Sequence, residues 1–203
     1  MEFTYKRADE LDFDPRPQIA MVFSEGFYRW LQELSKDKAC LARAFAHIFD
    51  LSQFFVAVHG DEIASIVGCC TAGTKPVSFD KQILCKEFGF LRGRIAKIML
   101  TKYLLQNVYP FPLGAETGSI EIVASSPKYH RTGSAFGLIN YVMETLPYRD
   151  YVLEVVDNNT GAIALYEKLG FREIQRTPEK HAKRAGFDYR IYMKHSADGK
   201  EAD

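Results

Sequence analysis

The sequence predicts an α/β fold in which helices pack on a mixed β-sheet. Three observations support this class. The chain has 203 residues, 47% of them hydrophobic, which is enough for one sizeable core. Two consecutive apolar runs, 54–58 and 63–72, have the composition of paired strands. From residue 119 onward strand-like and helix-like segments alternate, an order typical of a sheet with a parallel crossover.

The N-terminal part is predicted to form a short strand and two helices before the apolar runs. Residues 3–8 are typical of a strand, and Asp14 followed by Pro15 marks the entrance to a helix. Apolar residues recur at helical spacing from Ile19 to Leu34, and again from Leu41 to Phe49. The two apolar runs then follow as a β-hairpin.

A basic segment separates this hairpin from the alternating half. Residues 75–109 carry seven Lys and Arg against two acidic residues. A helix is predicted from about Lys81 to Gln106 within the 75–117 segment. It either packs its apolar residues inward, among them Phe88, Leu91, Ile95, Ile98 and Leu105, or offers a basic amphipathic face to an acidic or membrane partner.

The alternating half contains four predicted strands and two helices. The strands span 119–125, 151–156, 171–177 and 187–194, and apolar stripes predict helices at 135–146 and 162–169. We expect one domain over residues 1–195, with 75–117 as a helical insertion and 196–203 as a flexible tail.

Composition argues against several classes of protein. The 26 basic and 26 acidic residues balance, which disfavours a nucleic-acid partner. No stretch reaches the roughly 18 apolar residues of a membrane span, and the start is not a signal peptide, so we expect a cytoplasmic protein without an integral membrane segment. The four cysteines, Cys40, Cys69, Cys70 and Cys85, form no metal-binding pattern, so we expect no metal and reduced, structural thiols.

A glycine-containing loop joins a predicted strand to a helix at residues 130–135. Gly133 permits a tight turn, and the first amides of the following helix point outward at the positive end of its dipole. Such a helix start can bind a pyrophosphate, and Lys128 and Arg131 can add positive charge. The loop is neither a Walker motif nor a three-glycine dinucleotide motif. Without further context a purely structural turn is the alternative.

Two segments, in this order, resemble the GNAT superfamily of acetyl-CoA-dependent N-acetyltransferases. HRTGSA, residues 130–135, is similar to the family's Q/R-x-x-G-x-G/A loop, with His130 where Gln or Arg is usual. The preceding SSPKY resembles the family's V-x-P-x-Y strand exit, with Ser125 in place of Val. NTGAIALYEKLGF, residues 159–171, agrees with N-x-x-A-I-x-L-Y-x-K-x-G-F at every fixed position.

The resemblance implies a GNAT-like acyltransferase fold with about seven strands. The sheet would splay between its fourth and fifth strands, 119–125 and 151–156, and acetyl-CoA would enter the gap as co-substrate. The resemblance also implies a set of cofactor-binding residues: Val123 and Ser125 for the pantetheine arm, His130, Arg131, Thr132, Gly133, Ser134 and Ala135 for the pyrophosphate, and Asn159 near the thioester. Read without the family, Asn159 is a helix N-cap.

Acetyl transfer to an amine requires a base, because an alkylammonium with a pKa of roughly 10.4 is protonated at neutral pH. The resemblance implies that Glu121 takes this proton, directly or through water, with Glu154 as the second candidate. It implies that Tyr166 protonates the leaving thiolate. The structural alternatives are an exposed or ion-paired Glu121 and a Tyr166 that only packs in the core.

The expected activity is therefore transfer of an acetyl group to a primary amine of a small molecule or peptide, by direct attack in a ternary complex. The alternative is a domain that binds CoA or acyl-CoA without turnover and contacts an acidic or membrane partner through its basic helix. A homodimer is a further arrangement to test.

Overall fold

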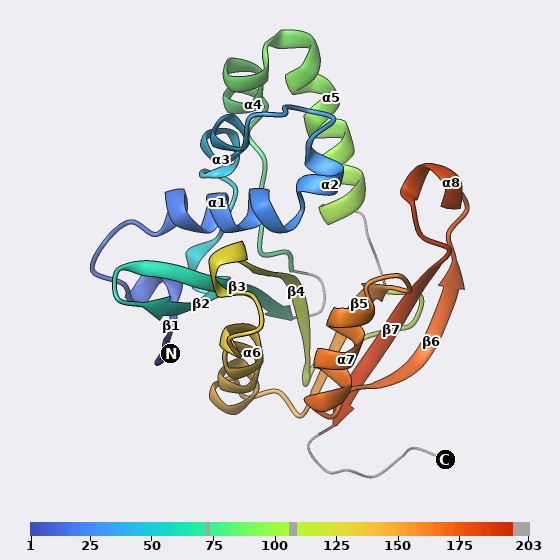
Figure 1. Ribbon diagram of the computed structural model, residues 1–203. Helices are drawn as coiled ribbons and strands as arrows, with labels where there is room; N and C mark the ends of the chain where they lie inside the picture. The colour runs from blue at the N-terminus through green and yellow to red at the C-terminus, as the bar shows by residue number, and fades with distance from the viewer. Residues whose placement is uncertain (72–73, 106–108, 197–203) are drawn as a thin grey trace.

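A seven-stranded mixed sheet forms the centre of the computed structural model of the protein (Figure 1). The structure describes residues 1–71, 74–105 and 109–196. The strand order is β1-β2-β3-β4-β5-β7-β6; β4 and β5 run parallel, and the other neighbours are antiparallel. The strands are β1 (Thr4–Arg7), β2 (Phe54–His59), β3 (Glu62–Thr71), β4 (Thr117–Ser125), β5 (Asp150–Val156), β6 (Arg172–Pro178) and β7 (Tyr189–Ser196).

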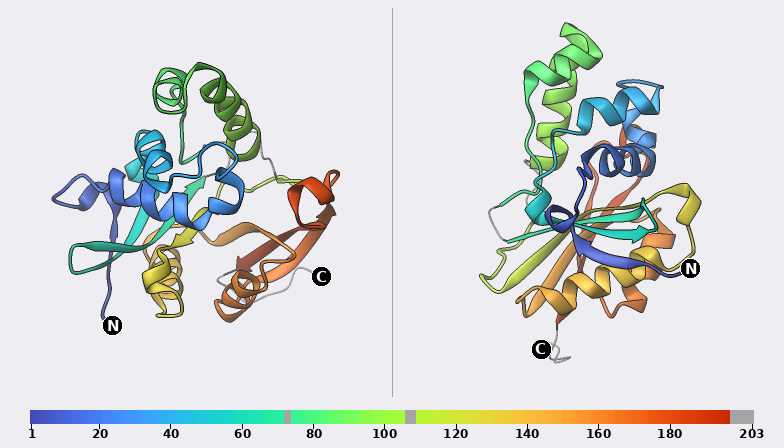
Figure 2. Two further views of the ribbon diagram at one scale, coloured as in Figure 1. Left: turned by 45° about the horizontal axis from the view of Figure 1, so that its top comes forward. Right: turned by 90° about the vertical axis from the view of Figure 1, so that its left-hand side faces the viewer.

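Helices cover both faces of the sheet. In Figures 1 and 2, α1 to α5 lie on one side and α6 and α7 on the other. The helices are α1 (Arg16–Gly26), α2 (Tyr28–Leu31), α3 (Lys38–Phe45), α4 (Lys81–Phe88), α5 (Phe90–Leu100), α6 (Ser134–Thr145), α7 (Thr160–Lys168) and α8 (Ala182–Ala185). Short 3-10 turns occupy η1 (Ala8–Glu10), η2 (Leu51–Gln53) and η4 (Pro127–Tyr129), and the π-helical turn η3 (Thr101–Leu105) extends α5.

Each face of the sheet has its own hydrophobic cluster. Phe54 and Val56 of β2 pack with α1 and α3 in the first cluster, whereas Phe55 and Ala57 pack with α6 in the second. This alternation follows from the pleat of a strand, which directs successive side chains to opposite faces. Both sides of β2 are therefore buried.

The predicted strands and the mixed sheet are confirmed, but two predicted helices are interrupted. The helix expected over Ile19–Leu34 ends at Gly26, where a Cβ atom would lie 2.7 Å from Cβ of Ala124, and α2 follows separately. The helix expected from Lys81 breaks at Gly89, whose φ of +79° ends α4 and allows α5 to fold back onto it. Gln106, the last residue of that predicted helix, and residues 197–203, nearly all of the predicted tail, lie outside the described residues.

Of the two alternatives for the basic helix, inward packing of its apolar residues is wrong for three of the five. Leu91, Ile95 and Ile98 are 70%, 52% and 70% exposed. The buried face of α5 consists instead of the small residues Gly93 and Ala96, together with Leu100 at the end of the helix. Gly93 packs directly on the backbone of α4 at Cys85, where no side chain fits, and this close approach determines which face of α5 points outward.

The sheet opens between β4 and β5. Their parallel pairing runs only from Thr117 opposite Asp150 to Ile120 opposite Leu153, whereas β5 pairs with β7 along its whole length, from Asp150 to Val156. One extra residue in β4 interrupts its register with β3, and Ile122 there has a φ of 53°. This bulge bends the end of β4 away from β5, as bulges generally do. The predicted splay is thus confirmed. Among the described residues no helix is long and apolar enough to cross a membrane.

Candidate active site

The loop after β4 presents unused backbone amides at the start of α6. Arg131 and Gly133 both have positive φ angles, 60° and 88°, which turn the chain sharply into the helix. The amide of Gly137 donates to the carbonyl of Gly133 over 2.9 Å, so the helical hydrogen bonds begin there and the preceding amides point outward. A Cβ atom at Gly133 would meet nothing within 4 Å. The space in front of these amides is open, which suits a phosphate group.

Three serine side chains fix this helix start to the sheet. The hydroxyl of Ser65 in β3 lies 2.7 Å from that of Ser125 in β4 and 2.7 Å from that of Ser134 in α6. The predicted residues Ser125 and Ser134 therefore meet at one buried point, through a partner that the sequence did not reveal. Their hydroxyls hold the loop in place rather than pointing out of it.

Two basic side chains near the loop, His130 and Lys128, bind other groups of the protein and do not extend toward the candidate phosphate site. His130 turns back, and its Nε2 atom, which must carry the hydrogen, donates to the carbonyl of Ser125 over 3.1 Å. Lys128 binds Glu62 at 2.7 Å, and the Tyr129 hydroxyl donates to the same carboxylate. These hydrogen bonds lower the pKa of Glu62, that from Lys128 having the larger effect. Arg131 is the remaining basic residue of the loop, and it is exposed.

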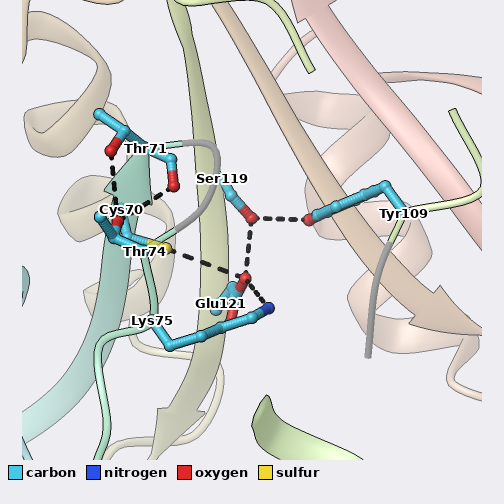
Figure 3. Close-up of polar contacts among 7 residues, drawn as sticks. All are labelled: Cys70, Thr71, Thr74, Lys75, Tyr109, Ser119 and Glu121. Carbon is cyan, nitrogen blue, oxygen red and sulfur yellow. Dashed lines mark hydrogen bonds and ion pairs between the residues drawn. The ribbon is translucent and has the colours of Figure 1, made fainter. Parts of the chain in front are cut away.

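Glu121 lies at the point where the sheet opens. It follows Ile120, the last residue of β4 paired with β5, and its side chain is 18% exposed (Figure 3). Its Oε1 atom accepts a hydrogen bond from Lys75 Nζ at 3.0 Å and from Ser119 Oγ at 3.1 Å. The Cys70 thiol is 3.9 Å from the same oxygen. No described residue donates to Oε2, so this oxygen remains available to a ligand.

Two further residues complete the cluster around Glu121. The Tyr109 hydroxyl lies 2.8 Å from Ser119 Oγ, and burial raises the pKa of this phenol. Burial, and secondly the charge of Glu121, raises the pKa of Cys70 to about 12, so this thiol stays protonated. Cys69 belongs instead to the hydrophobic cluster beneath α6, so the two adjacent cysteines face opposite sides of the sheet.

The insertion contributes to the site from both of its ends. Lys75 precedes α4, and Tyr109 follows η3, so the chain leaves and re-enters the Glu121 cluster around the helical excursion (Figure 3). Lys75, Ser119 and Tyr109 were not predicted as site residues. Only Ser119 could have been predicted from the sequence. Residues two apart on a strand share a face, and Ser119 lies two residues before Glu121.

Glu154, the second candidate base, is held in an ion-pair network. Arg190 of β7 lies 2.6 Å from Glu154 and 2.9 Å from Glu179, and all three side chains are mostly buried. Next to this network, the ring of Tyr192 packs on those of Tyr109 and Phe111. Aromatic rings and paired charges therefore line the face of the sheet beyond Glu121.

The second sequence motif forms α7, on the opposite face of the sheet. Asn159 is its N-cap, because its side chain accepts a hydrogen bond from the Ala162 amide at 3.3 Å. Tyr166 is 6% exposed and packs edge-on against Phe171. Burial raises its pKa, so the phenol keeps its proton at neutral pH. Tyr166 thus belongs to the hydrophobic cluster on the α6 side of the sheet, and among the described residues it makes no recorded contact with Glu121.

A sheet that opens between two parallel strands, with outward-pointing amides at the neighbouring helix start, defines a class of acyltransferase domains. Residues 23–171 match the sequence model of the acetyltransferase (GNAT) family. The chain belongs to this family. A search of the curated proteins finds no significant match.

Solved structures share the fold at low sequence identity. The ribosomal-protein-S18-alanine N-acetyltransferase of Escherichia coli is 14% identical with a TM-score of 0.54, and the match covers 99% of this chain and 100% of that chain. An N-acetyltransferase from Staphylococcus aureus Mu50 is 15% identical with a TM-score of 0.57, covering 95% and 100%. A chain of the NatC complex bound to Gag peptide and CoA is 14% identical with a TM-score of 0.56, covering 97% and 99%.

Proposed function

We propose that this protein is an N-acetyltransferase that moves an acetyl group from acetyl-CoA to a primary amine. The observation that carries the proposal is the position of Glu121, whose Oε2 atom accepts no hydrogen bond from the described residues and lies directly beyond the last paired residues of β4 and β5. A carboxylate with an open oxygen beside a gap in the sheet can receive a proton from a molecule bound there. We assign the domain to residues 1–195 and expect it to act in the cytoplasm.

The proposed binding mode places CoA along the opening of the sheet. Its pyrophosphate binds the amides of Gly133, Ser134 and Ala135, flanked by His130, Arg131 and Thr132. Its pantetheine arm pairs with the free edge of β4 at Val123 and Ser125, where β5 has diverged. Asn159 lies near the thioester. No metal takes part in this scheme.

The proposed reaction is a direct attack in a ternary complex. Oε2 of Glu121 takes a proton from the ammonium group, directly or through water, and the neutral nitrogen then forms a bond to the thioester carbon. The C–S bond breaks, and the thiolate takes the phenolic proton of Tyr166, which burial keeps in place at neutral pH. The second proton that the nitrogen loses restores the phenol through solvent. The products are CoA and an acetamide. Lys75 and Ser119 orient Glu121 through its other oxygen.

The proposed acceptor is a primary amine of a small molecule or a peptide. It would lie against the aromatic wall formed by Tyr109, Phe111 and Tyr192. Two of the structural neighbours are associated with protein or peptide acceptors. One is the ribosomal-protein-S18-alanine N-acetyltransferase, and the other belongs to the NatC complex bound to Gag peptide and CoA. This likeness supports including peptide N-termini among the acceptors tested.

The second candidate is a domain that binds CoA or acyl-CoA without turnover. One observation favours it: both carboxylates near the gap are ion-paired, Glu121 with Lys75 and Glu154 with Arg190. An ion pair that held Glu121 for stability alone would leave the site without a base.

Release of CoA from acetyl-CoA across a panel of amines and peptides distinguishes the two candidates. CoA binding is measured in parallel by calorimetry on the same protein. Acceptor-dependent release that falls in Glu121→Gln, but not in the control Glu116→Gln at an exposed position directly before the same strand, supports the enzyme. Tight CoA binding with background release for every acceptor supports the binding domain and overturns the proposed activity.

A further inference from the structure

The outward face of α5 combines large apolar side chains with basic ones. Phe90, Leu91, Ile95 and Ile98 are 69%, 70%, 52% and 70% exposed. In an ordinary surface helix such residues face the core and polar ones face the solvent. On α5 the small residues Gly93 and Ala96 are buried, so the arrangement is reversed. We refer to Phe90, Leu91, Ile95 and Ile98, with Arg92 and Arg94, as the α5 face.

The charge on this face is positive. Arg92 and Arg94 are exposed on α5, and Lys81 and Lys86 are exposed on the adjoining α4. The single acidic residue of α4 and α5 is Glu87, which is directed away into an ion pair with Arg43 of α3 at 3.3 Å. Within α4 and α5, Arg92 and Arg94 are therefore not accompanied by a carboxylate.

The position of α5 leaves its outer side accessible. In Figures 1 and 2, α4 and α5 stand at the end of the molecule farthest from α6 and α7, on the outside of α1 to α3. The residues of the insertion that contact the Glu121 cluster are Lys75 and Tyr109, and both lie outside α5. The α5 face is therefore separate from the proposed catalytic groups.

We propose that the α5 face binds an anionic lipid surface, lying in the plane of the membrane with its apolar side chains among the acyl chains and its basic ones at the headgroups. This occupant satisfies both properties of the face, because a bilayer containing acidic lipids supplies an apolar layer directly beneath a layer of negative charge. A nucleic acid would neutralise the cations but leave four large apolar side chains in water. A second copy docked through the same face would bring Arg92 and Arg94 of both chains together without a carboxylate of α4 or α5 between them.

Sedimentation of the full chain with lipid vesicles tests this proposal. Phosphatidylcholine vesicles are compared with vesicles that also contain phosphatidylserine, at low and high salt. We expect binding to the serine-containing vesicles, weakened by salt because the attraction is partly electrostatic. Arg92→Gln with Arg94→Gln should weaken binding roughly 25-fold, since each cation near such a surface contributes about a factor of five. Leu91→Gln with Ile98→Gln should weaken it at least about tenfold by removing inserted apolar surface.

Matched substitutions on a distant surface serve as controls. Lys180→Gln with Lys183→Gln removes two exposed cations, and Ile174→Gln removes an apolar side chain that is 48% exposed on β6. Both should bind vesicles as the original chain does, and circular dichroism verifies that all variants are folded. Equal binding to both kinds of vesicle, no binding, or loss in the controls to the same extent overturns the proposal. So does light scattering that shows a dimer dissociated by the α5 variants, because a second copy then covers the face.

Discussion

Lys75 Nζ lies 3.0 Å from Oε1 of Glu121, and the two residues come from segments 46 positions apart in the chain. Their side chains are 26% and 18% exposed, so the ion pair is largely shielded from solvent. Lys75 begins the insertion, and Tyr109 at its other end lies one hydrogen bond further, on Ser119. The insertion is thus attached by both ends to the strand that bears the proposed base, and its conformation and that of Glu121 depend on each other.

Replacing Glu121 by Gln should lower kcat/KM by about 10²–10⁴-fold, the usual contribution of a general base. The amide keeps the size of the side chain and an acceptor for Lys75, but it cannot take a proton. Steady-state CoA release over a range of acceptor concentrations measures the effect, and calorimetry should give an unchanged Kd for CoA. Wild-type kcat/KM in this variant would assign Glu121 to a structural role.

Replacing Tyr166 by Phe should lower kcat about 100-fold while leaving the Kd of CoA and the melting temperature nearly unchanged. The phenol is the proposed proton donor, and its ring, which packs on Phe171, is retained. Tyr151→Phe is the contrasting variant, because that hydroxyl donates to backbone carbonyls at the end of α6. It should cost about 1 kcal/mol of stability and no activity. A Tyr166→Phe enzyme with full kcat would mean that this residue only packs.

Gly133→Ala should weaken CoA binding and destabilise the fold by about 1–2 kcal/mol, because a Cβ atom is strained at a φ of +88°. The surrounding space is open, so the cost comes from the backbone and not from a clash. Gly161→Ala is the matched control: this glycine lies in α7 without a close neighbour and without a positive φ. It should be neutral or stabilise the fold by up to about 1 kcal/mol. Calorimetry and urea unfolding of both variants provide the comparison, and equal effects would contradict the strain argument.

Arg190→Met should destabilise the protein by about 2 kcal/mol, because it leaves Glu154 and Glu179 without their common cation in a mostly buried position. The control Arg176→Met removes the ion pair between Arg176 and Glu173, whose side chains are 51% and 36% exposed respectively. This change should lower the free energy of unfolding by less than about 1 kcal/mol. Chemical denaturation at neutral pH measures both free energies of unfolding. A cost at Arg190 no larger than that at Arg176 would show that water still reaches the network.

The stability of the protein should fall as the pH drops through about 6.5, because burial lowers the pKa values of His195 and His47 below the ordinary histidine value of 6.5. Near and below 6.5 the unfolded chain binds more protons at these histidines than the native protein, so unfolding becomes easier. His195→Gln should flatten the change in unfolding free energy between about pH 7.5 and 5.5, with His47 supplying the remainder. His181→Gln, at an exposed site, should keep the original slope. An unaltered slope in the His195 variant would contradict the prediction.

Much of the fold could be predicted because its signals are local. The apolar runs of β2 and β3, the stripes of α6 and α7, and the two family motifs depend on residues close together in the sequence. The loop at 130–135 also follows from local chemistry, since Gly133 and the helix start are adjacent. Interruptions by glycine were harder to predict: Gly26 and Gly89 lie inside apolar patterns that continue across them, and only the packing against Ala124 and the positive φ of Gly89 reveal the breaks.

The class of sheet, the order of its elements, the candidate phosphate-binding loop and the family resemblance could all be predicted from the sequence alone. The hydrophobic periodicity and the motif spacing that predict them depend only on residues close together in the chain. The tertiary structure decided the partners of Glu121 and Ser125 and the outward orientation of Leu91 and Ile98. These relationships join residues far apart in sequence, and they depend on how closely backbones approach, as at Gly93 against α4. A pattern of apolar residues gives a helix two possible faces to bury, and only packing against its neighbours selects one.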